Sequence, residues 1–110
     1  MFAIEEDRKA INGRFVQTFA RTVKDHNTEL DVEAGTTGYK GSNKREAGGR
    51  TYVKIECCCG DFFFDPVKDE DGMVTGIEIA CCGDEGLNAI VKAVDFVRDV
   101  MNDQICEVNG

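Results

Sequence analysis

Six cysteines give this 110-residue chain its greatest capacity for chemistry, and three of them lie in the stretch ECCCGDFFFD at residues 56–65. Structural zinc sites use cysteine pairs with short spacers at a turn, so that both thiolates reach one ion. Adjacent cysteines on a strand point to opposite faces instead, and the single histidine, His26, is far away in the sequence. The spacing therefore disfavours a metal site, and no cofactor is expected.

Redox chemistry is the second reaction class that cysteines suggest. It requires a thiolate of low pKa, normally in a Cys-x-x-Cys pair at a helix N-terminus. Cys82 directly precedes the last predicted helix, but Asp84 and Glu85 follow it and oppose thiolate formation. The redox signal is weak for this reason.

The simplest interpretation of the cysteines is that most of them pack as small apolar side chains, because free cysteine is among the most buried residue types. Alternation predicts that one set faces the core: Val53, Ile55, Cys57, Cys59, Ile79 and Cys81. Cys58, Cys82 and some of the phenylalanines then fall on the opposite face. An uncovered apolar face on a small domain predicts a dimer or partner surface.

Carboxylates are the other abundant reactive groups. General acid–base catalysis needs carboxylates in a cleft with separated pKa values, which residues at a hairpin tip rarely provide. With one histidine in the chain, no Ser/His/Asp or Cys/His arrangement can be assembled. The protein is therefore not expected to be an enzyme.

The elements that must position these residues follow from hydrophobic periodicity. Apolar residues at helical spacing from Ile4 to Val23 predict an N-terminal helix over residues 3–26. Alternation predicts strands over residues 28–35 and 50–59. Gly60-Asp61, a two-residue hairpin signal, and the turn KDEDG at residues 68–72 predict two further strands, over 62–67 and 73–82. A second amphipathic pattern predicts a C-terminal helix over 84–104, with a buried stripe of Leu87, Ile90, Val91, Val94, Val97 and Met101.

The expected fold class is therefore α+β: an N-terminal helix, a three- to four-stranded antiparallel β-meander and a C-terminal helix, with both helices packed on one sheet face. The length predicts a single domain over residues 1–110.

Five glycines within residues 35–49 predict a flexible, basic loop at about 35–50. Its candidate contacts for a partner's acidic patch or a nucleotide are Tyr39, Lys40, Lys44 and Arg45.

The formal net charge is −8, and the acidic surplus lies in residues 51–110, which hold thirteen acidic and four basic side chains. An acidic body repels phosphate backbones, so direct nucleic-acid binding is not expected, whereas basic protein partners are favoured. The predicted partner-binding residues are Asp65, Asp69, Glu70, Asp71, Asp95, Asp99 and Asp103. The last three repeat every four residues on the predicted helix, so they could imitate a phosphate backbone or simply form a solvated face.

The N-terminal segment MFAIEEDRKA is acidic and has no basic stretch followed by an apolar one, so a secretory signal is not expected. The longest apolar runs are too short to cross a bilayer. These features predict a cytoplasmic protein with reduced cysteines and no membrane partner.

Two families resemble this chain in layout. The helix–strands–helix order with CCGDEGLNAIVKAV entering the last helix resembles double-stranded-RNA-binding domains, but Asp84 and Glu85 stand where those domains carry lysines. The 110-residue length, the acidic DPVKDEDG hairpin tip and helices flanking a small sheet resemble small acidic phage anti-defence proteins of the anti-CRISPR type. That resemblance implies stoichiometric inhibition of a CRISPR effector or other nuclease, in the host cytoplasm if the chain is phage-encoded.

Three functional hypotheses follow. The leading one is a non-enzymatic acidic inhibitor, a DNA mimic in one version, that binds a nucleic-acid-handling protein. The alternative is a dimeric adaptor or secretion-type chaperone that uses an open sheet face, which would make the chain a homodimer. The third is a small-ligand binder that uses Tyr39 and Lys40 of the Gly-rich loop.

Overall fold

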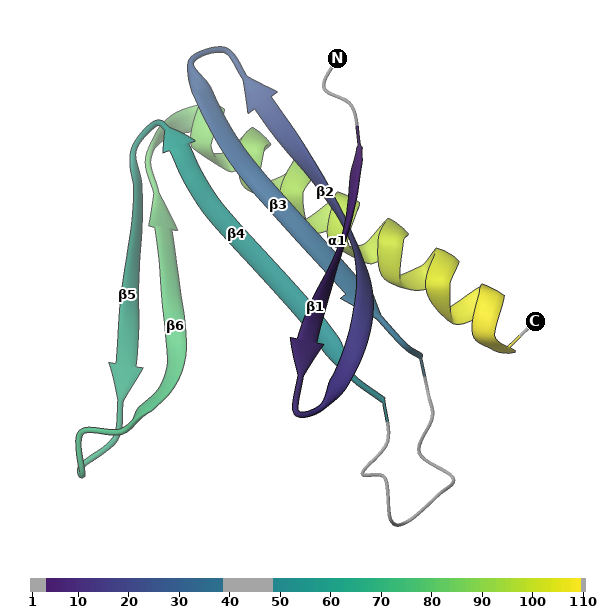
Figure 1. Ribbon diagram of the computed structural model, residues 1–110. Helices are drawn as coiled ribbons and strands as arrows, with labels where there is room; N and C mark the ends of the chain where they lie inside the picture. Colours follow the sequence, from purple (N-terminus) through teal and green to yellow (C-terminus); the bar gives the residue numbers. More distant parts are fainter. Residues whose placement is uncertain (1–3, 39–48, 110) are drawn as a thin grey trace.

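The computed structural model describes residues 4–38 and 49–109, in which there are six strands and one helix (Figure 1). β1 to β4 form an antiparallel sheet in sequence order, and β5 and β6 form a separate two-stranded sheet. The fold is a β-rich α+β fold. The elements are β1 (Glu5–Ile11), β2 (Arg14–Asp25), β3 (Thr28–Thr36), β4 (Thr51–Cys59), β5 (Phe62–Lys68), β6 (Val74–Cys81) and α1 (Gly83–Asn109).

The predicted N-terminal helix is wrong, because the segment from Glu5 to Asp25 is the β1–β2 hairpin. Its turn is made by Asn12 and Gly13, whose φ angles are 47° and 83°. Two positive φ angles in succession are typical of a type I′ turn, and Asn-Gly is the strongest short signal for it. This local turn preference outweighs the helical spacing of the apolar residues. As a result one helix covers the sheet, and not two as predicted.

The four predicted strands are confirmed as β3 to β6, and the C-terminal helix is confirmed as α1. The predicted continuous meander is wrong at one connection, because β5 does not return along β4. A bulge between Glu29 and Leu30 interrupts the β3–β4 register at this end, and Gly60 takes a φ of 128°. The chain therefore leaves the sheet, and β5 and β6 project as an arm (Figure 1).

The main core lies between α1 and the centre of the four-stranded sheet. α1 packs mostly across β3 and less across β2. Leu30, Val32 and Ala34 of β3 point toward the helix, and the small side chains of Ala89 and Ala93 let the two elements approach closely. This core is built from β3 alternation and a helical stripe of small residues.

The buried stripe of α1 differs from the predicted one. Its fully covered apolar positions are Ala89, Ala93, Phe96 and Val100, whereas Leu87, Val91 and Val94 are 57%, 49% and 55% exposed. Ile90, Val97 and Met101 lie between these two sets and pack partly against the core. The prediction chose the wrong face of the helix, because it assigned the larger aliphatic side chains to the core and overlooked the alanines.

The β1–β2 hairpin curls across the sheet face opposite α1, which completely buries Val16 and Thr18. The curl begins where β2 separates from β3, beyond the pair Phe19–Ala34. Gly35 is required here, because a Cβ at this position would overlap the carbonyl oxygen of Gln17. The missing side chain allows the backbone of β2 to cross directly over β3.

A side chain from α1 completes the hydrogen bonding at this crossing. The Gln104 amide nitrogen Nε2 donates to the carbonyl oxygen of Gln17 at 2.9 Å, and its Oε1 accepts from the Thr36 backbone N–H at 2.8 Å. Gln104 is buried, so both backbone groups would otherwise lie away from water without a partner. One amide therefore joins β2, β3 and α1.

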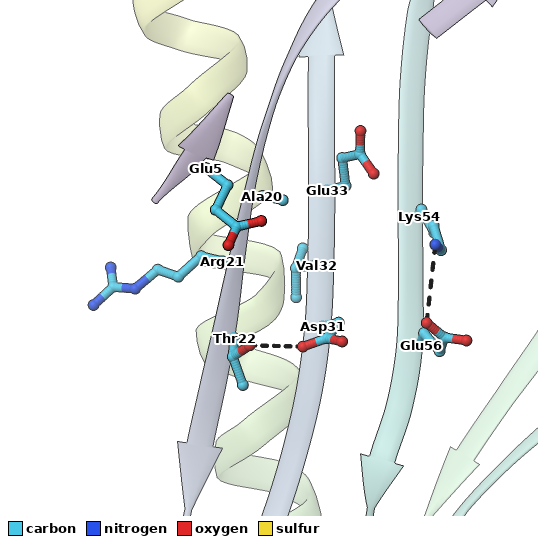
Figure 2. A pocket seen from close by; sticks show the side chains of 9 residues that line it. All are labelled: Glu5, Ala20, Arg21, Thr22, Asp31, Val32, Glu33, Lys54 and Glu56. Atoms are coloured by element: carbon cyan, nitrogen blue, oxygen red, sulfur yellow. Dashed lines mark hydrogen bonds and ion pairs between the residues drawn. The ribbon is translucent and has the colours of Figure 1, made fainter. Parts of the chain in front are cut away.

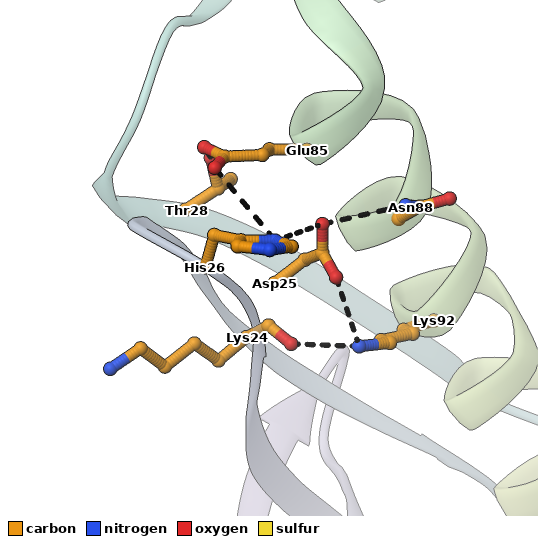
Figure 3. Close-up of polar contacts among 7 residues, drawn as sticks. All are labelled: Lys24, Asp25, His26, Thr28, Glu85, Asn88 and Lys92. Atoms are coloured by element: carbon orange, nitrogen blue, oxygen red, sulfur yellow. Dashed lines mark hydrogen bonds and ion pairs between the residues drawn. The ribbon is translucent and has the colours of Figure 1, made fainter.

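A polar cluster ties the β2–β3 turn to the first turns of α1 (Figure 3). The Asp25 carboxylate accepts hydrogen bonds from His26 at 3.2 Å and Asn88 at 3.4 Å and lies 3.6 Å from the Lys92 ammonium. Lys92 also donates to the Lys24 carbonyl oxygen at 2.8 Å. The hydrogen bond from His26, followed by that from Asn88 and by the charges of His26 and Lys92, lowers the pKa of Asp25.

The Gln104 bridge predicts a large stability loss in the variant Gln104→Leu. The substitution leaves the Thr36 N–H and the Gln17 carbonyl unsatisfied, which we expect to lower the free energy of unfolding by about 2 kcal/mol or more. Gln17→Leu is the control, since it keeps the Gln17 carbonyl and changes only an exposed side chain; its effect should stay within about 0.5 kcal/mol. Urea unfolding measures both, and equal losses would contradict the bridge.

The Asp25 cluster predicts a pH-dependent effect of Asp25→Asn. Because folding lowers the pKa of Asp25 below 3.8, its carboxylate stabilises the fold above that pH, and the contribution is lost as pH falls through the lowered value. We expect a lower urea midpoint for the variant at pH 7 and a difference that shrinks in acid. The control is Asp71→Asn. Asp71 is exposed and has no ion pair in the described residues, so this substitution should leave the urea midpoint unchanged. A pH-independent difference would contradict the assignment.

Candidate functional site

The tip of the β5–β6 hairpin is an ordered acidic turn at the end of a projecting arm (Figure 1). The Asp69 carboxylate accepts the backbone N–H groups of Asp71 and Met73 at 2.9 and 3.0 Å, and its carbonyl accepts that of Gly72 at 3.1 Å. These bonds fix the turn and leave Glu70 exposed beside Asp71. Neither Glu70 nor Asp71 has an ion pair within the described ranges.

Negative charge continues down the arm from the tip. Asp65 on β5 lies directly opposite Glu78 on β6, and both side chains are exposed. Cross-strand partners share one face of a sheet, so the two carboxylates add to the same field. Asp65, Asp69, Glu70 and Asp71, four of the predicted partner-binding residues, are thus brought together on one arm.

The other three predicted partner-binding residues lie on α1, away from the tip (Figure 1). Arg98 stands 3.3 Å from Asp95 and 3.9 Å from Asp99, so the charge of these two carboxylates is partly compensated. Asp103 lies beside Gln104 and lines a shallow pocket with Ile4 and Phe19. The seven residues therefore form two separate acidic groups and no continuous row.

The predicted loop contacts Tyr39, Lys40, Lys44 and Arg45 lie outside the described residues. β3 ends at Thr36, inside the predicted 35–50 segment, and β4 begins just after that segment at Thr51, which pairs with Thr36. Here the Thr37 backbone N–H donates to the Arg50 carbonyl at 2.9 Å. The two described ends of this segment are therefore held side by side.

A groove of about 350 Å³ runs over the sheet face opposite α1 (Figure 2). Thr22 donates to Asp31 at 2.6 Å, and Lys54 pairs with Glu56 at 3.9 Å. Four carboxylates and two cations occur along it, so its net charge is negative. The lining residues are Glu5, Ala20, Arg21, Thr22, Asp31, Val32, Glu33, Lys54 and Glu56.

The electrostatics at the β4 side of this groove keep one cysteine protonated. The hydrogen bond from Thr22, and then one from Cys58, lower the pKa of Asp31. Partial desolvation, the hydrogen bond to Asp31 and the charges of Asp31, Glu29 and Glu56 raise the pKa of Cys58 to about 11. A thiol with this pKa is a poor nucleophile and a poor metal ligand at neutral pH.

The remaining cysteines are distributed over several surfaces. Cys57 and Cys81 are half-buried, and Cys57 packs against the core as predicted. Cys59 is exposed, so its predicted core position is wrong; the bulge interrupts the alternation here, and Cys59 pairs with Glu29 whereas Cys57 pairs with Leu30. Across residues 4–38 and 49–109, no group of three or more His, Cys, Asp or Glu side chains is arranged to hold a metal ion.

Comparison with known proteins gives no relative, since no protein-family model, no curated protein and no solved structure matches the chain. In the part of the chain that the structure describes, no helix has both the length and the apolar character needed to cross a membrane. The site must accordingly be judged on its own geometry.

Sequence reasoning missed the groove and the exposed apolar stripe of α1. Two of the groove residues, Lys54 and Glu56, lie on β4. Their alternation with Val53 and Ile55 in the sequence does predict that they lie on the second sheet face, away from the core. One side of the groove is formed by the curled β1–β2 hairpin, and the sequence pattern predicted a helix in its place. The Asn12-Gly13 pair was the signal that could have revealed it.

The Cys58 environment predicts slow alkylation at pH 8 in the folded protein. Asp31→Asn removes the nearest charge, and we expect the iodoacetamide rate at Cys58 to rise about tenfold. Asp71→Asn removes one charge from the distant tip and should leave this rate unchanged. Peptide mass spectrometry after timed labelling reports each cysteine, and an unchanged rate in Asp31→Asn would contradict the role of Asp31.

Proposed function

We propose that the protein is a non-enzymatic, cytoplasmic acidic inhibitor that binds a basic, nucleic-acid-handling protein, such as a CRISPR effector or another nuclease. The observation that supports this proposal is the projecting β5–β6 arm, whose hydrogen-bonded tip presents Glu70 and Asp71 without an ion pair in the described residues. The arm is the contact element, and its target is a surface rich in Lys and Arg.

The physical reason lies in how such proteins bind nucleic acid. They neutralise phosphates with Lys and Arg side chains, and carboxylates of suitable spacing compete for the same groups. Because the Asp69 carboxylate already holds the backbone of the turn, little conformational entropy is lost when the tip binds. The tip therefore competes with phosphates at a small ordering cost.

The helix carboxylates contribute less to this proposal than the tip. Asp95 and Asp99 already interact with Arg98, so a partner's lysine or arginine would have to displace an existing ion pair. A continuous imitation of the phosphate backbone along α1 is for this reason not the version that we propose. The contact is confined to Asp65, Asp69, Glu70 and Asp71.

A second candidate function, a dimeric adaptor or secretion-type chaperone, is supported by a different observation. Large apolar side chains are exposed on the arm and on α1, including Phe63, Met73 and Leu87. A client protein with an apolar segment could cover them. This function predicts a client that has no connection with nucleic acid.

Competition with DNA tests the leading proposal. We expect the tagged protein to capture a nuclease or other DNA-handling protein from a lysate that contains CRISPR effectors, and excess duplex DNA to displace it. The affinity should fall as salt rises, because exposed charges make the contact. A captured DNA-handling protein that neither DNA nor salt displaces would contradict the charge-based contact, and a client unrelated to nucleic acid would support the adaptor.

A matched pair of double variants locates the contact. Glu70→Gln with Asp71→Asn removes two charges from the tip and should weaken binding about tenfold. Asp95→Asn with Asp99→Asn removes the same charge from α1 and should change binding much less. The reverse order of effects would reject the tip as the contact.

A further inference from the structure

The β5–β6 hairpin has one wholly apolar face but almost no core of its own. The cross-strand pairs Phe62–Cys81, Phe64–Ile79 and Pro66–Ile77 share one face, and all six side chains are apolar. We call them the apolar arm face. Only Phe62 reaches the main core, and Ile77 is 62% exposed. The pairs on the other face are mixed: Phe63–Ala80, Asp65–Glu78 and Val67–Gly76.

Such a hairpin needs a partner surface to be stable. A two-stranded hairpin alone is marginally stable in water, because it buries too little apolar area to offset the entropy of ordering it. Within the described residues β5 and β6 pair only with each other. One face of the arm is wholly apolar and the other carries the Asp65–Glu78 pair, which indicates that the wholly apolar face is the one covered in the functional protein.

A second uncovered apolar surface lies on α1. Leu87, Val91 and Val94 recur at helical spacing on one exposed stripe. We call these three residues the α1 stripe. Next to it the half-buried Ile90 and Val97 pack against the core. The stripe therefore continues the apolar core onto the surface without a polar boundary between them.

The chain cannot bring these two surfaces together within one copy. Cys82 alone separates β6 from α1, and a Cβ on Gly86 would lie 3.0 Å from the Cys81 Cβ, so the base of the arm is tightly packed on the helix start. From this shared base the arm and α1 run in diverging directions (Figure 1). The distal part of the apolar arm face is thereby held away from its own α1 stripe.

The chain exposes more surface than a compact monomer of its size. The radius of gyration is 15.8 Å, compared with about 13 Å for a compact domain of this length. The accessible surface is 7635 Å², roughly 1,600 Å² above the value of about 6,000 Å² for a compact monomer of this mass. Two copies together would expose about 3,200 Å² of such excess, and permanent homodimers bury on the order of 2,000 Å² or more in total.

We infer that the apolar arm face of each chain packs against the α1 stripe of a second copy, forming a two-fold symmetric homodimer. Each chain carries both surfaces, so one rotation satisfies both contacts and closes the assembly at two copies. The acidic tip lies beyond the apolar arm face and stays exposed in this arrangement. The inference is independent of the proposed function, since it requires neither a nuclease nor the tip carboxylates.

Sedimentation equilibrium tests the dimer directly. We expect a mass of twice 12.1 kDa for the wild-type chain, and a mass of one chain for Ile77→Asp and for Val91→Asp. A charge in the centre of an apolar contact should lower the association constant by roughly a hundredfold or more. The matched control is Val67→Asp, which makes the same change on the opposite face of the arm and should remain dimeric.

Hydrogen exchange makes the test independent of the variants. On dilution of the wild-type chain, amides of β5 and β6 should lose protection while those of β2 and β3 keep theirs, because only the arm depends on the second copy. A wild-type chain that stays monomeric, including one whose arm is covered only by a different protein, would overturn the inference. So would a dimer that both Ile77→Asp and Val91→Asp leave intact.

Discussion

The side-chain amide of Gln104 is the interaction on which the shape of the sheet depends. Where β2 leaves β3, the regular ladder ends, and two backbone groups lose their partners beneath α1. The amide supplies one donor and one acceptor at this place, so β2 can separate from β3 without leaving buried groups unsatisfied. This separation allows β1 and β2 to curl over the opposite face, where they bury Val16 and Thr18 and wall the acidic groove.

The second constraint is the width of a single helix. An α-helix with its side chains is about 10 Å wide, whereas neighbouring strands lie about 4.8 Å apart. One helix therefore covers about two strands, and here α1 covers β3 and part of β2. Val53 on β4 faces the same side as the helix and is half-exposed as a consequence. The apolar surfaces left at this edge of the molecule follow from a sheet that is wider than its cover.

The sequence predicted those elements whose local and long-range preferences agree. Strands β3, β4 and β6 alternate, β5 is marked by the turns on either side of it, and α1 combines a helical period with an acidic first turn, Asp84 and Glu85. At the N-terminus two preferences conflict: apolar residues from Ile4 to Val23 have helical spacing, but Asn12-Gly13 favours a hairpin turn. The Asn-Gly turn preference, together with the cost of glycine inside a helix, prevailed over a loosely periodic pattern.

Pairing and packing were harder to predict than the elements. Gly60-Asp61 resembles an ordinary hairpin turn, and only the three-dimensional structure reveals that β5 turns away from β4. The phase of α1 was also ambiguous, because a stripe of alanines and a stripe of larger aliphatic residues both have helical spacing. Packing against β3 selected the alanines, which fit under Leu30 and Val32. The acidic residues at the tip needed no such information, since a turn between strands is solvent-exposed in any pairing.

The arm joins the rest of the protein at Cys82 and at Gly60, and Gly60 sets the direction in which β5 leaves β4. A Cβ there would meet the Thr28 side chain at 3.0 Å, and the φ of 128° disfavours any residue other than glycine. β5 has seven residues, so the tip lies about 23 Å from Gly60. A rotation of about 10° at the base would carry the tip sideways by about 4 Å. The position of the acidic tip is thus set by two short connections far from it, and a small difference in geometry at the base becomes a larger difference at the tip.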